Sequence, residues 1–375
     1  RRKLMKKNNI LLICTLFLLL HICTAAAQNG DVTALVNGTV VPVTGPAIEQ
    51  GTVIIEDGII TGVGGNIAVP DNARLIDVTG LYVYPGMIDS YTRLGLTEIS
   101  SVSATTDVRE KGTYNPFIKA AVAVNPHSVH IPITRVNGIT TVLAAPAGGV
   151  ISGRTVIYHL SGGEIDEMAE KESGGLMITF PRQPEKKSGG EKESETTNKL
   201  AQKKIDELKD LLKQAARYKE AMQAYSEGNL PSPPDFSQTL ESLIPAVEKK
   251  EPVFILADKE ADIRGAARFA REMDLDAVLV GCSEAWKAAD SLAAHNIPLI
   301  IASVLRSPDE KDPYDAIFAN AHLLHKAGVT FAFATGSASS CRNLPYHAGT
   351  AAAFGLDKEE ALKAVTINSA EILSV

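Results

Sequence analysis

Continuously apolar runs of five to seven residues recur along the chain from residue 82 onward, and helical stretches separate most of them. Strands that are apolar on both faces and alternate with helices are typical of a parallel sheet or barrel. We therefore predict an α/β fold. The seven runs span residues 82–88, 139–144, 176–180, 252–257, 277–281, 298–302 and 329–335. An eighth candidate, 155–160, follows the second run too closely for a parallel crossover, so a hairpin excursion is the alternative.

Between residues 31 and 77 the pattern changes to short alternating stretches that are separated by turn dipeptides. These dipeptides are Asn37-Gly38, Asp57-Gly58 and Gly64-Gly65. Apolar and polar residues that alternate between such turns predict a small antiparallel sheet ahead of the larger domain.

Residues 1–27 have the pattern of a signal peptide. Five basic residues precede the apolar run 10–23, and small residues up to Ala27 provide a cleavage site. The run is shorter than the ~20 residues that span a bilayer, so we expect cleavage and no membrane span afterwards. We expect the protein to be exported, to the periplasm or outside the cell. Cleavage changes the formal net charge from −7 to −12, which argues against nucleic acid as a partner.

Residues 181–250 interrupt the alternation of strands and helices and are predicted to form a helical insertion. A polar linker, 183–198, leads into an amphipathic helix, and a proline-rich segment follows it. The apolar face carries Ile205, Leu208, Leu212, Ala215 and Met222, and lysines and glutamates cover the other face. We interpret the insertion as a surface excursion, with a partner-binding helix as the alternative.

Several motifs occur in an order that matches a known family. They are PGMID (85–89), NGITTVL (137–143), SEAW (283–286), AGVTFAFATGS (327–337) and GLDKEEALKAVTINSAEIL (355–373). On these motifs the chain resembles the amidohydrolase superfamily, specifically its imidazolonepropionase-like metal-dependent hydrolases. The resemblance implies that residues 28–80 form the N-terminal part of a β-sandwich and residues 81–375 a (β/α)8 TIM-like barrel. It also implies further C-terminal strands, so we expect the natural protein to be longer.

The family's metal ligands are the part of the resemblance that this sequence lacks. The family holds one or two divalent ions with His-x-His after the first strand, His after the fifth and sixth strands, and Asp after the last, and some members add Lys or Glu after the fourth. Such ions acidify a bound water and polarise a carbonyl. The corresponding positions here carry Tyr91, Arg93, Asp258, Cys282 and Ser337. Because Arg93 cannot deprotonate to bind a metal, we expect no metal cofactor.

In such barrels the functional groups lie at the C-terminal ends of the strands. The polar residues predicted at these ends are therefore the candidate site residues. We assign Asp258, Glu284 and His347 as candidate acids or bases. The candidate ligand-binding residues are Tyr91, Arg93, Cys282, Ser337 and Arg342. Arg93 and Asp258 are either paired across the mouth or separately solvated. Cys282 and Cys341 form either a disulfide or two buried thiols.

Two functional hypotheses follow. In the first, the protein is an exported hydrolase of carbon–nitrogen bonds that has replaced the metal with another arrangement. In the second, it is a catalytically silent barrel that binds a small molecule, forms a homo-oligomer, or pairs with an intact relative. The family favours the first hypothesis, and the substituted ligand positions favour the second. The motifs do not identify the substrate, because the loops of a barrel determine its specificity.

Overall fold

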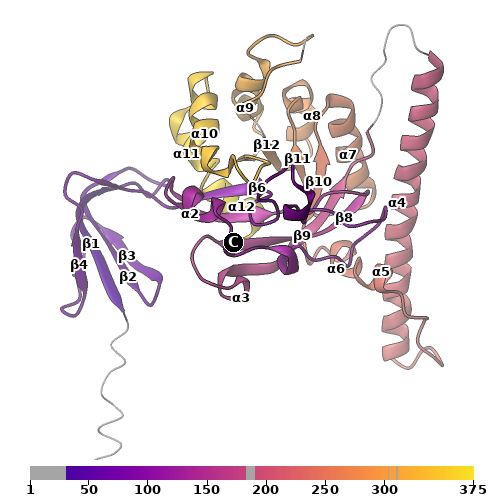
Figure 1. The fold of residues 1–375 in the computed structure, drawn as a ribbon, viewed down its shortest axis with the longest axis horizontal. Coiled ribbons are helices and arrows are strands. Elements are labelled where there is room, and N and C mark those ends of the chain that lie inside the picture. Colours follow the sequence, from indigo (N-terminus) through magenta and orange to yellow (C-terminus); the bar gives the residue numbers. More distant parts are fainter. Residues whose placement is uncertain (1–30, 183–190, 303, 310) are drawn as a thin grey trace, which may run out of the picture. The chain divides into compact units, whose positions relative to one another are not determined.

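The computed structural model describes residues 31–182, 191–302, 304–309 and 311–375, and it divides into two compact units, Arg1–Pro85 and Gly86–Val375 (Figure 1). The predicted signal peptide and residues 183–190 of the predicted linker lie outside the described residues. No helix among the described residues is long and apolar enough to cross a membrane.

The first unit contains one five-stranded sheet in the order β3-β2-β1-β4, with β5 also paired to β1. Its strands are β1 (Val32–Val40), β2 (Ile48–Glu56), β3 (Ile59–Gly64), β4 (Arg74–Asp77) and β5 (Tyr82–Val83). Strands β1, β2 and β3 pair antiparallel, as predicted. The prediction of a purely antiparallel sheet is wrong for β4, which pairs parallel to β1. The start of the run 82–88, predicted as a barrel strand, forms β5 of this sheet instead and also pairs parallel to β1.

The turn dipeptides of this sheet behave differently from one another. Asp57 and Gly58 join β2 to β3 with positive φ angles of 49° and 82°, which confirms that turn. Asn37-Gly38 instead lies inside β1, at a shift in its pairing with β2. Asn37 has a φ of 65°, which a short polar side chain tolerates. A Cβ on Gly38 would lie 2.8 Å from a methyl carbon of Val78, so close packing rather than a turn requires this glycine.

The second unit is built on an eight-stranded sheet in which the strands follow the chain order. The strands are β6 (Met87–Thr92), β7 (Ile139–Ala144), β8 (Ile151–His159), β9 (Ala169–Thr179), β10 (Val253–Ala257), β11 (Ala277–Gly281), β12 (Leu299–Ala302) and β13 (Phe331–Ala334). Just past β13, the amide of Gly336 donates to the carbonyl of Tyr91 on β6 at 2.9 Å. This bond brings the first and last strands together, so the fold is the predicted α/β barrel.

One strand of the barrel runs against the others. β8 pairs antiparallel with both β7 and β9, whereas the other neighbouring strands pair parallel. β8 is the eighth candidate strand of the sequence, and its short connection to β7 allows only the hairpin alternative. The reversed strand therefore brings its N-terminal end, near Ile151, to the edge where the parallel strands have their C-terminal ends.

The apolar runs are buried on both faces of the barrel. Along β11, Val278 and Val280 belong to the cluster inside the barrel, while Ala277 and Leu279 belong to the cluster that packs against the helices. Figure 1 shows α7 to α11 following one another along the side of β10 to β13. The helices after β10 are α7 (Glu260–Glu272), α8 (Ala289–Ala293), α9 (Ala316–Lys326), α10 (Leu344–Ala353), α11 (Lys358–Lys363) and α12 (Ile367–Leu373).

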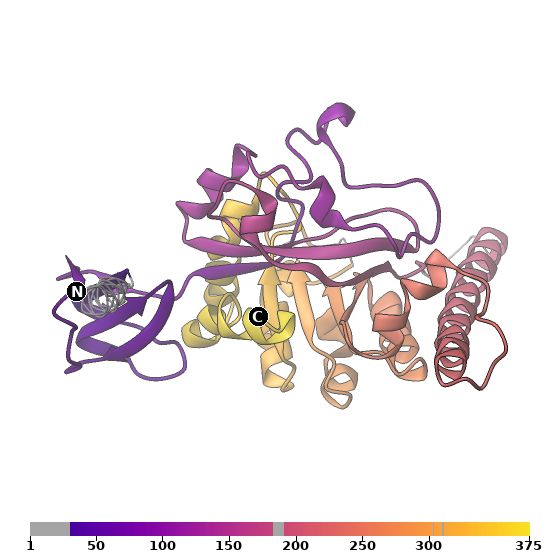
Figure 2. The ribbon, with the colours of Figure 1, turned by 90° about the horizontal axis from the view of Figure 1, so that it is seen from below.

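The connections near the start of the barrel carry short helices and irregular segments. Among the described residues, the 3-10 helices Ser103–Thr105 and Ala120–Ala123 lie in these connections, whereas Ala285–Ala288 and Cys341–Asn343 follow β11 and β13. The short helices before β9 are α2 (His130–Arg135) and α3 (Ile165–Met168). In Figure 2 the violet and magenta connections of β6 to β9 lie on the opposite side of the sheet from the orange and yellow helices.

The insertion contains the long helix α4 (Glu191–Ser226) and the short helices α5 (Gln238–Glu241) and α6 (Ile244–Val247). The predicted apolar face of α4 is buried at Ile205, Leu208, Leu212 and Ala215, whereas Met222 is 36% exposed. Ion pairs join its polar face to the barrel unit, including Lys209 with Glu272 of α7. The apolar face of α4 is therefore packed within this chain between Ala201 and Tyr218.

Candidate functional site

The ends of β6 and β13 border a cavity of about 820 Å³. Arg93 lines it just after β6, and Ser337 lines it just after β13. The connection that follows β6 supplies most of the remaining wall, including Glu98, Arg109 and several serines. We call this space the mouth cavity, because it lies where barrels of this kind place their functional groups.

Arg93 is held in a fixed position beside the mouth cavity. Its Nη1 donates to the main-chain carbonyls of Ala145 and Pro146, which follow β7. Its Nη2 donates to the hydroxyl of Tyr91 at 2.7 Å, and the guanidinium lies 5.0 Å from the centre of that ring. Burial raises the pKa of Tyr91, and the nearby guanidinium partly offsets that shift. The structure thus brings the two candidate residues after β6 together.

Asp89 lies on β6, two residues before Tyr91, and is fully buried. One carboxylate oxygen accepts from the amides of Thr335 at 3.1 Å and Tyr91 at 3.3 Å. The other accepts from the hydroxyl of Thr335 and from the thiol of Cys341, the latter at 3.1 Å. Burial raises the pKa of Asp89 to about 6 although these hydrogen bonds lower it. The carboxylate therefore ties β6 to the end of β13.

Asp258 directly follows β10, whereas Arg93 follows β6. Its carboxylate forms an ion pair with Arg306 at 2.9 Å and accepts from the amide of Ser283 at 3.1 Å. Arg93 and Asp258 therefore have different partners, and the alternative in which they pair with each other is wrong. Arg306, which follows β12, is the partner that the sequence analysis missed.

Glu284 belongs to a compact group of opposite charges. Its carboxylate lies 3.2 Å from the ammonium of Lys259 and 3.3 Å from that of Lys287. The same two lysines pair with Asp309 and Asp312. The three carboxylates of this group lie close enough to hold a cation. The two lysine ammonium groups instead provide the positive charge, so the arrangement fits a closed network of ion pairs.

His347 lies in α10 and is 4% exposed. Its Nδ1 accepts a hydrogen bond from the amide of Val304 at 3.3 Å. Burial lowers the pKa of this imidazole to about 4. A neutral ring whose Nδ1 accepts carries its proton on Nε2, so His347 holds the segment after β12 in place.

We predict that His347 stays neutral across the physiological pH range. Its imidazole signal in a proton NMR titration is expected to shift with a midpoint below pH 5, because burial disfavours the charged ring. A His347→Gln variant assigns the signal, and the same residue in urea provides the control at about pH 6.5. A midpoint near that of the denatured chain would contradict the burial argument.

The remaining candidates lie in different environments. Ser337 is half-buried, and its carbonyl accepts from the hydroxyl of Thr92 at 2.7 Å. Arg342 is exposed. Cys282 and Cys341 are both free and buried. The two residues are therefore buried thiols and do not form a disulfide with each other. Burial raises the pKa of both thiols well above its ordinary value.

Arg109 is a residue of the mouth cavity that the strand pattern did not reveal. It lies in the irregular connection after β6 and reaches the site through a parallel bridge with Ala147. No strand ends next to Arg109, so the apolar runs contain no signal for it. The length of the connection between the first two runs, 89–138, is the only hint in the sequence.

Comparison with known proteins gives partial sequence matches and a structural match over most of the chain. The chain is 30% identical to a dihydroorotase from Thermoanaerobacter sp. (strain X514) over 148 residues, which are 38% of this chain and 32% of that protein. It is 26% identical to an enamidase from Eubacterium barkeri over 143 residues, 36% of this chain and 37% of that protein. An amidohydrolase from Thermotoga maritima MSB8 matches with a TM-score of 0.78 and 25% identity, over 91% of this chain and 88% of that one. The comparison with protein-family models found no match.

The structural match and the relatives together decide the family. The chain belongs to the amidohydrolase superfamily. It spans about a third of the length of the curated relatives it matches. These relatives are amidohydrolases of carbon–nitrogen bonds, whereas the side chains at the strand ends of this member differ from the ligands that the resemblance implies.

Two of the residues at the strand ends, Arg93 and Asp258, are engaged with other groups of this chain. A guanidinium has no free lone pair for a metal, and its permanent charge repels one. At the position after β6, Arg93 also occupies its donors with the carbonyls after β7. After β10, the carboxylate of Asp258 is already paired with Arg306. We infer from these contacts that the residues present do not suit the family's metal.

Proposed function

We propose that this amidohydrolase-fold protein binds a small anionic molecule at its mouth cavity without a divalent metal. The observation that supports this most strongly is the guanidinium of Arg93, which two carbonyls and the Tyr91 hydroxyl hold beside the cavity. A fixed positive charge next to a cavity favours an anion, as a metal ion would in a relative that holds one.

The chemistry of the cavity wall suggests which anion fits. Arg93 uses both N–H groups of Nη1 and one of Nη2 within the chain, which leaves its Nε–H and one Nη2–H without a partner among the described residues. Arg109 adds a second cation, and hydroxyls such as those of Ser101 and Ser337 line the same space. Two guanidinium groups with nearby hydroxyls suit a carboxylate-bearing molecule that is rich in oxygen.

Hydrolysis of a carbon–nitrogen bond by a replaced catalytic group is the other hypothesis. It would use Asp258, Glu284 or His347 as the acid or base. The contacts do not favour it, because Asp258 pairs with Arg306 and Glu284 with two lysines. His347, in turn, accepts from a main-chain amide. Binding is therefore the function that the geometry supports better.

We expect glucuronate to bind to the EDTA-dialysed protein and Arg93→Ala to weaken that binding by about tenfold or more. The loss of a charge-assisted contact at a partly buried position is worth about 1.5–3 kcal/mol, which corresponds to that factor. Isothermal titration calorimetry measures the affinity. N-acetylglutamate serves as a second carboxylate probe, and Arg217→Ala on the exposed face of α4 is the matched control.

Elemental analysis of the same dialysed sample decides whether the site is metal-free. We expect less than about a tenth of an equivalent of Zn, Mn or Fe. One equivalent of metal, with hydrolysis of a cyclic amide that EDTA abolishes, would support the hydrolase hypothesis instead. Equal affinity of the Arg93→Ala and wild-type proteins for both carboxylates would rule out the proposed site.

We also propose that the protein acts outside the cytoplasm. The support is the pattern of residues 1–27, with a basic start, an apolar run and small residues at the end. Mass spectrometry of the protein from the secreting host tests this, with Gln28 expected as its first residue. A retained leader in a cytoplasmic fraction would contradict the proposal.

A further inference from the structure

The connection after β6 begins with a small hairpin that forms much of the wall of the mouth cavity. The amide of Asp107 donates to the carbonyl of Leu96 at 2.8 Å, and an antiparallel bridge joins Thr97 to Thr106. We call these paired ends the base of the hairpin and residues 99–104 its tip. The tip residues that line the mouth cavity are Ile99, Ser100, Ser101 and Ser103.

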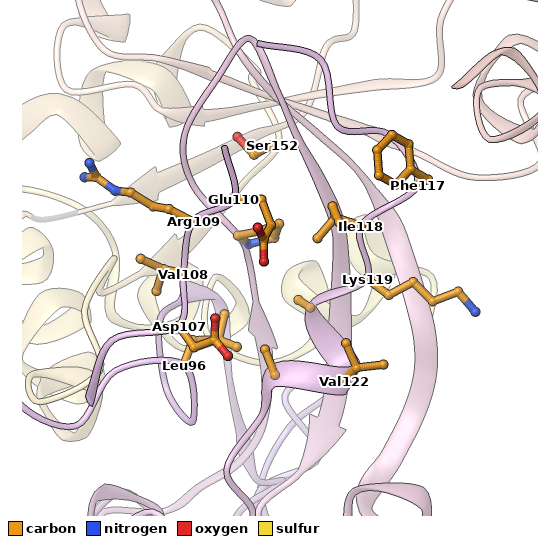
Figure 3. A pocket seen from close by; sticks show the side chains of 13 residues that line it. Leu96, Asp107, Val108, Arg109, Glu110, Phe117, Ile118, Lys119, Val122 and Ser152 are labelled. Atoms are coloured by element: carbon orange, nitrogen blue, oxygen red, sulfur yellow. The ribbon is translucent and has the colours of Figure 1, made fainter. Parts of the chain in front are cut away.

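The two faces of the base have different surroundings. Leu96 is buried, and together with Asp107 it lines a neighbouring cavity of about 310 Å³ (Figure 3). Thr97 and Thr106 line the mouth cavity. Residues two apart in an extended segment point to the same face. Ile99 therefore lies on the face of Thr97, toward the mouth cavity that it lines.

The base of the hairpin is anchored to the rest of the barrel unit through Glu98. The carbonyl of Glu98 lies 2.9 Å from Nε2 of His130, and its carboxylate accepts from the side-chain amide of Asn125 at 3.2 Å. Both partners belong to the segment that precedes β7. These contacts hold the base in place independently of the tip.

The tip has no such anchor among the described residues. All six of its residues are exposed. Their hydrogen bonds stay within the hairpin: the hydroxyl of Thr105 bonds to the amide and the carbonyl of Ile99, and the amide of Val102 donates to the same carbonyl. A segment with few buried contacts moves at a low cost in free energy. The tip is thus a self-contained loop on an anchored base.

Two apolar side chains of the tip are left in solvent at the edge of the mouth cavity. Ile99 is 55% exposed, and Val102 is 42% exposed. The wall of the cavity that follows β13 includes Ala338 and Ser339. Movement of the tip onto a ligand that lies against this wall would remove apolar surface of the tip from water, which favours the closed position.

From this arrangement we propose that the tip is a lid that closes over the anion bound at Arg93. The inference rests on the proposed function of the mouth cavity and adds a conformational step to it. On closure Ile99 packs against the ligand, and the serine hydroxyls of the tip bond to its oxygen atoms. Closure also excludes water from the charge-assisted contacts of Arg93, which strengthens them.

Hydrogen exchange measured by mass spectrometry tests the lid on the full chain. Saturating glucuronate is expected to slow the exchange of the tip amides about fivefold or more, because closure shields them from solvent. The exposed residues 161–164, which follow β8 at the other end of the barrel, are the internal control and are expected not to change. Arg93→Ala at the same glucuronate concentration is expected to leave the exchange of the tip unchanged.

A pair of cysteines distinguishes closure of the tip from contact with the ligand alone. Ser101→Cys with Ser339→Cys places one thiol on the tip and one on the wall after β13, both at exposed positions. The native thiols of Cys282 and Cys341 are buried. Glucuronate is expected to speed disulfide formation by the new pair about fivefold or more, since the closed position becomes more populated. Ser101→Cys with Ser161→Cys is the matched control and is expected to show no such increase.

The outcomes separate the lid from the proposed function. Binding of glucuronate without slower exchange at the tip would overturn the lid and leave the proposed function intact. Slower exchange without faster disulfide formation would do the same, because the tip would then touch the ligand without moving. If calorimetry shows that neither glucuronate nor N-acetylglutamate binds, the lid and the proposed function are both wrong.

Discussion

Asp89→Ala is expected to lower the free energy of unfolding of the barrel unit by about 3 kcal/mol or more. The substitution leaves the amides of Thr335 and Tyr91 without their acceptor in a fully buried place. Each buried donor that loses its partner costs about 1–3 kcal/mol. Urea unfolding followed by tryptophan fluorescence measures the loss, because the single Trp286 lies in the barrel unit.

The pH dependence of the free energy of unfolding distinguishes the effect of the charge of Asp89 from the effect of its hydrogen bonds. The pKa of about 6 in the folded state lies above the ordinary aspartate value of 3.8, so the folded state binds more protons in that interval. Stability is therefore expected to fall as pH rises from about 4 to about 6, by roughly 3 kcal/mol from this carboxyl alone. Asp89→Asn removes that slope, and Asp210→Ala on α4 keeps it. An Asp89→Asn protein with an unchanged slope would contradict the assignment.

The apolar runs predicted most of the barrel, because a strand that is buried on both faces must be apolar along its length. They also located the strand ends, and with them Arg93, Asp258 and Cys282. The direction of β8 was open in the sequence, since a run of apolar residues is the same for a parallel and an antiparallel strand. Only the shortness of its connection to β7 pointed to the reversed direction that the structure has.

The partners of the site residues were harder to predict than their positions. Asp89 bonds to Thr335, which is 246 residues away, and Arg93 bonds to carbonyls that carry no side-chain signal at all. Asn37-Gly38 shows the same limit in the small sheet, because a dipeptide that suits a turn also suits a close packing contact. Such contacts depend on which elements meet in the fold, and local pattern does not encode that.

Arg154→Leu is expected to destabilise the barrel unit by about 3–5 kcal/mol, because it leaves a buried carboxylate without its counter-charge. Arg154 on β8 pairs with Glu251 at 3.0 Å, and the two side chains are 12% and 8% exposed. Its guanidinium also donates to the carbonyls of Pro116 and Ser242, so one residue joins the reversed strand, the connection after β6 and the end of the insertion. Urea unfolding again measures the change.

The double variant Arg154→Leu with Glu251→Leu distinguishes the lost charge balance from the lost packing. Burial raises the pKa of Glu251 and Arg154 lowers it, so removing the arginine alone moves the carboxyl toward its neutral form. Replacing both partners removes the isolated charge, and we expect at least half of the lost stability to return. Lys203→Leu, which breaks the exposed pair with Glu207 on α4, is expected to leave the unfolding midpoint nearly unchanged. If the double variant were as unstable as Arg154→Leu, the hydrogen bonds to Pro116 and Ser242, rather than the ion pair, would be what holds β8 to its neighbours.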